Sequence, residues 1–275
     1  MRVGYPVYAG HGEIAAAIPV ARGLGFGFVD IAVDEPGMLE QDADEICRAL
    51  EECEMAAGVQ SPWESVYLGS VWEECVEGAE SAVLRCAEFA RAIGAEYLNV
   101  HLRDDLGVFA WQKETSDRLI RTARDSLQRL RDQIQGVEVV TAETTPMGIF
   151  SRLDAFSDAI RGTGVAVSFD IGHVLAAHDG DLDMLSKWGG ALADVVVVAH
   201  LSGYRPGDGA HFEPTPEELD AAITCLRPCP SLEFVLLEFF KGFEDLQLRD
   251  GRLAAARREV DAVWSAQGRR CRSGG

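Results

Sequence analysis

This chain of 275 residues lacks several sequence features, and each absence argues against a class of protein. Apolar runs such as Val195 to Ala199 are far shorter than the roughly 20 residues that a membrane-spanning helix needs, so no membrane partner is expected. Residues 1–8 read as a strand and lack the charged, apolar and small-residue regions of a signal peptide. We therefore expect a cytoplasmic protein.

Paired cysteines and basic residues are also scarce. The seven cysteines are an odd number and form no CxxC pair, which disfavours a disulfide scaffold or a thiolate zinc site. Lysine occurs three times only, and the formal charge is -20. A surface with this charge repels a phosphate backbone, so we expect no nucleic-acid partner.

Strand-like apolar runs alternate with segments of helical period along the whole chain, as expected for parallel βα units. The expected strands lie near residues 2–7, 26–33, 57–61, 96–101, 137–143, 164–170, 194–201 and 233–239. The expected helices lie near 12–23, 40–57, 70–93, 112–135, 150–161, 181–190, 215–226 and 244–266. The fold class is therefore α/β, and we expect a single (β/α)8 barrel, a TIM barrel, over residues 1–267. Residues 268–275 are rich in Gly, Arg and Ser, and we expect a disordered tail there.

One helix start is well specified by local chemistry. Thr215 is an N-cap residue, Pro216 suits the first helical turn, and Glu217 and Glu218 place negative charge against the helix dipole. The sequence therefore predicts a helix that begins at this point.

Five consecutive strands end in a side chain that can bind a metal. These residues are His101, Glu143, Asp170, His200 and Glu238. Strand ends meet at one rim of a (β/α)8 barrel, where loops converge over a concave space. Carboxylates crowded there repel one another, and a divalent cation offsets that repulsion. The alternative is a salt-bridged rim, with Arg103 or Arg205 supplying the counter-charge.

At these residues the sequence resembles the xylose isomerase-like barrel superfamily, which includes endonuclease IV, sugar isomerases and sugar epimerases. The likeness covers nearly the whole chain. It is carried by residues 27–31, 61–63, 97–101, 142–146, 168–173, 200–209 and 237–238. The site pattern is most similar to that of tagatose 3-epimerase-like enzymes.

The resemblance implies roles for individual residues. It assigns one divalent metal to Glu143, Asp170, His200 and Glu238, and it makes the two glutamates the catalytic proton-transfer pair. The motif from Asp170 to His173 matches the family's Asp-x-x-His, whose histidine contacts substrate in the mononuclear enzymes and ligates a second metal in endonuclease IV. Further substrate-binding candidates are Arg205, which lies near the place of the epimerases' substrate-binding arginine, His101 and His211.

The chain also departs from the endonuclease IV pattern. That resemblance would place a histidine in the third-strand motif, where this sequence has Gln60. A trinuclear zinc site is therefore disfavoured. Asp208 and His211 loosely match the aspartate and histidine that follow strand seven in that family, which leaves a second metal open.

These observations predict a divalent-metal-dependent sugar isomerase or epimerase that transfers a proton next to a carbonyl. Its partner would be a small sugar or hydroxy-ketone. Mixed carboxylate and imidazole ligands suit Mn, Zn, Co or Mg, and a homo-oligomer stays open. The alternatives are an endonuclease IV-like phosphodiesterase, a dehydratase or other lyase, and a barrel that binds metal or sugar without catalysis.

Overall fold

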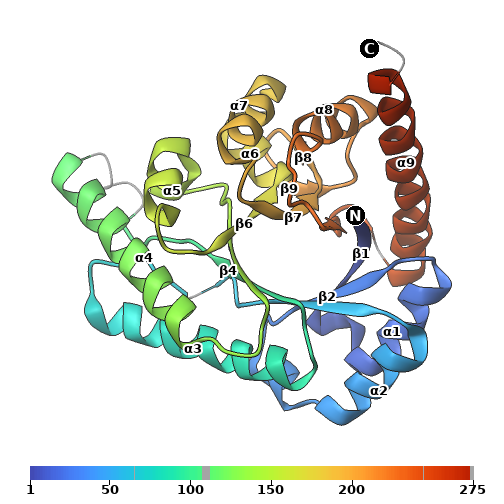
Figure 1. Ribbon diagram of the computed structural model, residues 1–275, viewed down its shortest axis with the longest axis horizontal. Coiled ribbons are helices and arrows are strands. Elements are labelled where there is room, and N and C mark those ends of the chain that lie inside the picture. The colour runs from blue at the N-terminus through green and yellow to red at the C-terminus, as the bar shows by residue number, and fades with distance from the viewer. Residues whose placement is uncertain (65, 107–111, 244, 273–275) are drawn as a thin grey trace.

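Eight parallel strands close into a barrel in the computed structural model, which describes residues 1–64, 66–106, 112–243 and 245–272 (Figure 1). The strands are β1 (Arg2–Val7), β2 (Phe28–Ala32), β3 (Ala56–Gln60), β4 (Tyr97–His101), β5 (Val139–Glu143), β6 (Ala166–Asp170), β7 (Val196–Leu201) and β10 (Phe234–Leu237). Each pairs with the next of these in the chain, and β1 pairs with β10 to close the ring. The predicted (β/α)8 barrel is confirmed.

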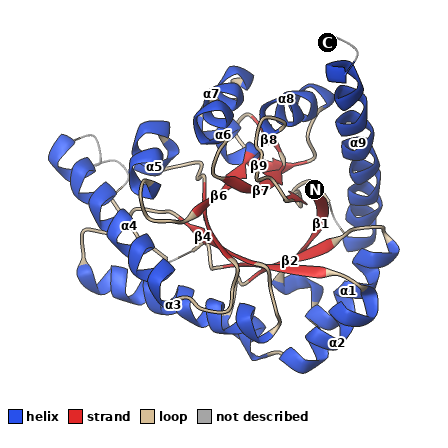
Figure 2. Ribbon diagram, in the orientation of Figure 1, coloured by secondary structure: helices blue, strands red, loops and turns tan. Residues whose placement is uncertain are grey.

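Helices surround the barrel, as Figure 2 shows in blue around the red strands. The eight that were expected are α1 (Ile14–Gly23), α2 (Ala43–Cys53), α3 (Glu73–Ala92), α4 (Lys113–Gln133), α5 (Leu153–Ile160), α7 (Leu182–Leu192), α8 (Pro216–Leu226) and α9 (Leu246–Arg272). A buried apolar layer joins the strands to these helices. Across the described residues, no helix is both long and apolar enough to cross a membrane.

The predicted start of α8 is confirmed by its hydrogen bonds. The Thr215 hydroxyl accepts from the Glu218 backbone N–H at 3.2 Å, and the Glu218 carboxylate accepts from the Thr215 N–H at 2.7 Å. Pro216 occupies the first turn, where its missing N–H costs no hydrogen bond. The capping box therefore fixes where this helix begins.

Three features differ from the sequence expectation. A short helix, α6 (Ile171–Ala177), follows β6 directly, and a hairpin of β8 (Gly203–Arg205) and β9 (Gly209–Phe212) follows β7. Both are too short to give a clear hydrophobic period. Helix α9 runs to Arg272, beyond its expected end near residue 266. Residues 273–275 lie outside the described residues, and the disordered tail expected over 268–275 stays a prediction.

Toward the amino-terminal ends of the strands, the barrel interior is filled by an apolar plug of five buried residues: Phe28, Tyr97, Val198, Phe234 and Leu236. The rings of Phe28, Tyr97 and Phe234 contact one another although β2, β4 and β10 are not neighbours in the ring, so they meet inside it. Glycine makes the room: a Cβ on Gly58 would lie 2.1 Å from the Tyr97 ring, and one on Gly4 equally close to Phe28.

Gly58→Ala is expected to destabilise the protein by about 1–3 kcal/mol, because the new methyl group overpacks the plug. The matched control is Gly78→Ala in α3, where a Cβ meets nothing within 4 Å. Alanine is a better helix former than glycine, so the control should be more stable by about 0.5–1 kcal/mol. Urea unfolding measures both changes, and equal stability of Gly58→Ala and the natural chain would contradict the packing argument.

Candidate functional site

The four expected metal ligands lie at the carboxyl ends of neighbouring or nearby barrel strands. Glu143 ends β5, Asp170 ends β6, and Glu238 directly follows β10. His200 lies in β7 and is the register partner of both Asp170 and Leu236. All four are buried, from 0% exposed for Asp170 and His200 to 6% for Glu238.

The structure brings these four side chains together around His200 Nδ1. Ligand atoms of the four residues all lie within 4.8 Å of one another. His200 Nδ1 lies 2.9 Å from Glu238 Oε2, 3.4 Å from Glu143 Oε2 and 3.6 Å from Asp170 Oδ2. Two ligands of one tetrahedral zinc-like ion are about 3.4 Å apart, so the set has the size of a single cation site.

Buried polar atoms without a hydrogen bond indicate whether these residues fit a metal ion. Asp170 Oδ2, His200 Nδ1 and Glu238 Oε2 are buried and form no hydrogen bond, although they face one another at short range. Buried polar atoms normally have a partner, and a bound cation would satisfy these three at once. The other His200 nitrogen, Nε2, is 3.1 Å from the Ser168 hydroxyl, which orients the ring with Nδ1 toward the carboxylates.

Electrostatics in the cluster follow from burial and from the mixture of charges. Burial alone lowers the pKa of His200, but the carboxylates of Glu238 and Glu143 raise it well above its usual value. Burial alone raises the pKa of Glu143, but His101 and His200 bring it well below its usual value. The pKa of Glu238 is also lowered by His200, so both glutamates are anionic, and positive charge at the centre of the site would stabilise them.

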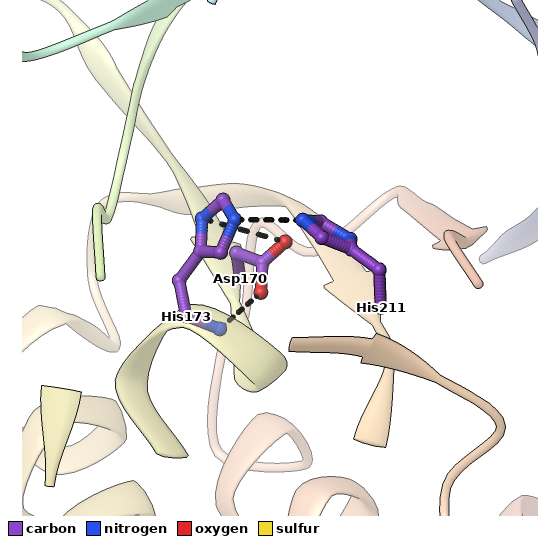
Figure 3. Close-up of side chains that lie close together, drawn as sticks. All are labelled: Asp170, His173 and His211. Carbon is purple, nitrogen blue, oxygen red and sulfur yellow. Dashed lines mark hydrogen bonds and ion pairs between the residues drawn. The ribbon is translucent and has the colours of Figure 1, made fainter. Parts of the chain in front are cut away.

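A second cluster shares Asp170 with the first (Figure 3). Asp170 caps α6, because its Oδ1 accepts from the His173 backbone N–H at 2.6 Å. The His173 ring therefore stands beside the same carboxylate, and its Nε2 lies 3.0 Å from His211 Nε2. His211 comes from β9, with a positive φ of 71°. The Asp-x-x-His spacing is thus explained as a helix cap that orients a histidine.

The pKa values of the two histidines in this cluster shift in opposite directions. Burial lowers the pKa of His173 by itself, but Asp170 and Glu143 raise it to about 9. Burial lowers the pKa of His211, and His173 adds to the lowering. A charged His173 thus donates from Nε2 to a neutral His211, whose Nδ1 donates to the Glu238 carbonyl at 3.2 Å.

A cavity of about 530 Å³ opens above the cluster. Glu143 and Glu238 line it, whereas Asp170 and His200 lie beneath its surface and are 0% exposed. Aromatic walls come from Tyr8, Trp63 and Phe240. The glutamates therefore face the space where a small molecule would bind, and the other two ligands are screened from it.

The remaining expected site residues divide into two groups. His101, His173 and His211 line the cavity, and His101 Nε2 lies 3.4 Å from Glu143 Oε2. Arg205 is not brought to the cavity. Its guanidinium donates to the carbonyls of Tyr204 and Glu213 and pairs with Glu218 at 3.4 Å.

Sequence reasoning did not find several residues at the cavity or beneath it. Tyr8, Ser61 and Lys241 line the cavity, and Asn99 donates to Glu143 below it. Tyr8, Ser61 and Asn99 lie in or directly beyond a barrel strand, as Glu143, Asp170 and Glu238 do, whereas Lys241 lies in the loop after β10. Their position was therefore visible, but a tyrosine, serine or amide at a strand end is too common a residue to single out.

Comparisons with known proteins agree with this geometry. Residues 18–224 match a family model described as a xylose isomerase-like TIM barrel. No curated protein is similar enough in sequence to match.

Similar solved structures include three whose barrels cover nearly the whole chain. An IOLI protein with a bound zinc atom has a TM-score of 0.75 at 14% identity, covering 97% of this chain and 99% of its own. A D-psicose 3-epimerase solved in the presence of D-fructose has 0.69 at 14%, covering 96% and 99%. Endonuclease IV from Thermus thermophilus has 0.69 at 18%, covering 94% and 99%. At these identities the likeness establishes the fold, and with the family match it shows that this chain belongs to the xylose isomerase-like TIM barrel family.

Proposed function

We propose that this protein is a divalent-metal-dependent isomerase or epimerase that moves a proton next to the carbonyl of a small sugar or hydroxy-ketone. One observation carries the proposal. Two buried glutamates, Glu143 and Glu238, come from strands that are not neighbours, line one cavity, and converge on His200 Nδ1 together with Asp170. Such an arrangement lets two carboxylates approach one small molecule from different sides.

Glu143, Asp170, His200 and Glu238 would hold the ion, since their ligand atoms all lie within 4.8 Å of one another and three of the four residues have an atom there that forms no hydrogen bond. A divalent ion bound there would polarise the carbonyl and hydroxyl oxygens of a polyol and make the adjacent C–H more acidic. Carboxylate oxygens with imidazole nitrogen suit manganese, zinc, cobalt or magnesium.

The chain's own residues would handle the proton. In this proposal one glutamate takes the proton from carbon and the other returns it to the same or the neighbouring carbon, which gives epimerisation or isomerisation. His173, His211 and His101 line the same cavity; His101 Nδ1 forms no hydrogen bond, whereas His173 and His211 bond each other. Arg205 receives no substrate contact, because its guanidinium is held by the hairpin and by Glu218.

A second candidate is metal-dependent phosphodiester cleavage of the endonuclease IV type. The cluster of Asp170, His173 and His211 favours it, because it offers a further set of ligand atoms beside the first. Gln60 lies where that enzyme class is expected to have a histidine, and the net charge of -20 repels a duplex. We therefore rank this activity second.

The metal assignment is tested by Asp170→Asn. Asparagine keeps an oxygen that caps α6 but removes an anionic ligand, so the variant should fold and bind metal about tenfold or more weakly. Asp181→Asn is the matched control, because Asp181 caps α7 in the same way and is exposed. Elemental analysis after dialysis against a chelator measures retention, and equal retention in both variants would refute the ligand role.

The proton-transfer chemistry is tested with metal-loaded protein and a panel of ketoses in deuterated water. We expect deuterium at the carbon beside the carbonyl in recovered sugar, and a loss of about 100-fold or more in Glu238→Gln, because an amide cannot accept the proton. Glu217→Gln, an exposed position at the start of α8, should keep the natural rate. Cleavage of an abasic duplex without exchange in any sugar would instead support the second candidate.

A further inference from the structure

Two amide side chains connect the two glutamates from beneath. Gln60 Nε2 on β3 donates to Glu238 Oε1 at 3.3 Å and to Asp30 Oδ1 at 2.7 Å. Asn99 Nδ2 on β4 donates to Glu143 Oε2 and to Gln60 Oε1, the latter at 3.3 Å. The result is a continuous chain of hydrogen bonds from Glu238 through Gln60 and Asn99 to Glu143, which we call the amide bridge.

The donors and acceptors of the two amides allow one arrangement of this bridge. An amide nitrogen has two hydrogens, and both are used in Gln60 and in Asn99. Gln60 Oε1 accepts from Asn99, and Asn99 Oδ1 accepts from the Thr141 hydroxyl at 3.0 Å. Ionised carboxylates only accept, so turning over the Gln60 amide would set its oxygen against the oxygens of Asp30 and Glu238, and its nitrogen against the Asn99 nitrogen. The orientation of each amide is therefore fixed by its neighbours.

The bridge lies on a rigid base. Gln60, Asn99 and Thr141 are register partners on β3, β4 and β5, so they occupy one level of the barrel. Tyr97, whose ring belongs to the apolar plug, donates its hydroxyl to Asp30, which in turn accepts from Gln60. Gln60 is 2% exposed and Asn99 0%, so solvent does not compete for these bonds.

Burying polar side chains costs free energy, and the apolar plug shows that apolar side chains can also fill this barrel. The hydrogen bonds of Gln60 and Asn99 indicate what the polar side chains do here. Gln60 engages Oε1 of Glu238 and leaves Oε2, which faces His200 Nδ1 at 2.9 Å and has no hydrogen bond. Asn99 engages Oε2 of Glu143, the oxygen that lies 3.4 Å from His200 Nδ1, and leaves Oε1 at 3.0 Å from His173 Nδ1. Each amide thus sets the rotation of one carboxylate.

We propose that Gln60 and Asn99 are positioning residues that fix the two glutamates in mutually dependent orientations for metal binding. The inference rests on the proposed metal centre and goes beyond it, because neither amide is one of its ligands. Partners of ligands are expected to change metal affinity about 10–100-fold when removed. Since the two amides bond each other, loss of either should disturb both ends of the bridge.

Cobalt(II) titration tests the proposal in the full-length protein, because the visible absorption of the bound ion reports ligand geometry independently of activity. Gln60→Met removes two donors at nearly constant volume, and it should weaken cobalt binding about 10-fold or more and shift the absorption bands. The matched control is Gln41→Met, which loses bonds to the Ile14 backbone nitrogen and the Gly12 carbonyl, and none of these residues lines the cavity. The control should leave affinity and spectrum unchanged.

Asn99→Leu provides a second variant, with folding checked by circular dichroism for each protein. It should also weaken binding and shift the bands, and the double variant Gln60→Met/Asn99→Leu should lose less affinity than the product of the two single losses, because the residues act through one bridge. A folded Gln60→Met or Asn99→Leu with natural affinity and spectrum would overturn the bridge while leaving the metal centre intact. A natural chain that binds no cobalt would overturn the metal centre, and with it the role given to the bridge.

Discussion

Three carboxylates buried around one imidazole nitrogen repel one another, and the arrangement of the barrel mouth follows from that constraint. Glu143, Asp170 and Glu238 each lie within 3.6 Å of His200 Nδ1, where water cannot screen their charge. Positive charge at the centre offsets the repulsion, whether as a proton on His200 or as a bound cation. Asp170 Oδ2, His200 Nδ1 and Glu238 Oε2 form no hydrogen bond despite these short contacts, which is compatible with an ion-binding site.

The barrel interior separates apolar and polar side chains into layers. Aromatic and aliphatic side chains fill the lower interior, and Gly4 and Gly58 leave the space those rings need. The amides of Gln60 and Asn99 lie one level higher, and the ligands lie above them at the strand ends. Each layer thus supports the next, because packed apolar side chains hold the strands in the register that the polar contacts require.

Much of this protein was predictable from local patterns in the sequence. The alternation of apolar runs and helical periods predicted all eight strands of the ring and every helix around it except the short α6, since those periods reflect side-chain geometry within each element. The cap at Thr215 was readable for the same reason. Strand-end positions also indicated Glu143, Asp170, His200 and Glu238, because strand ends of a parallel barrel share one rim.

The remaining features depend on contacts between residues far apart in the chain. Gln60 and Asn99 form a bridge only because the register of β3 and β4 makes them partners, and periodicity does not report register. The hairpin of β8 and β9 brings His211 over the site and holds Arg205 away from it, although both follow the same barrel strand. The sequence by itself determined the elements and the residues at their ends, whereas tertiary structure decided which of those side chains face one another, since that choice depends on packing across strands.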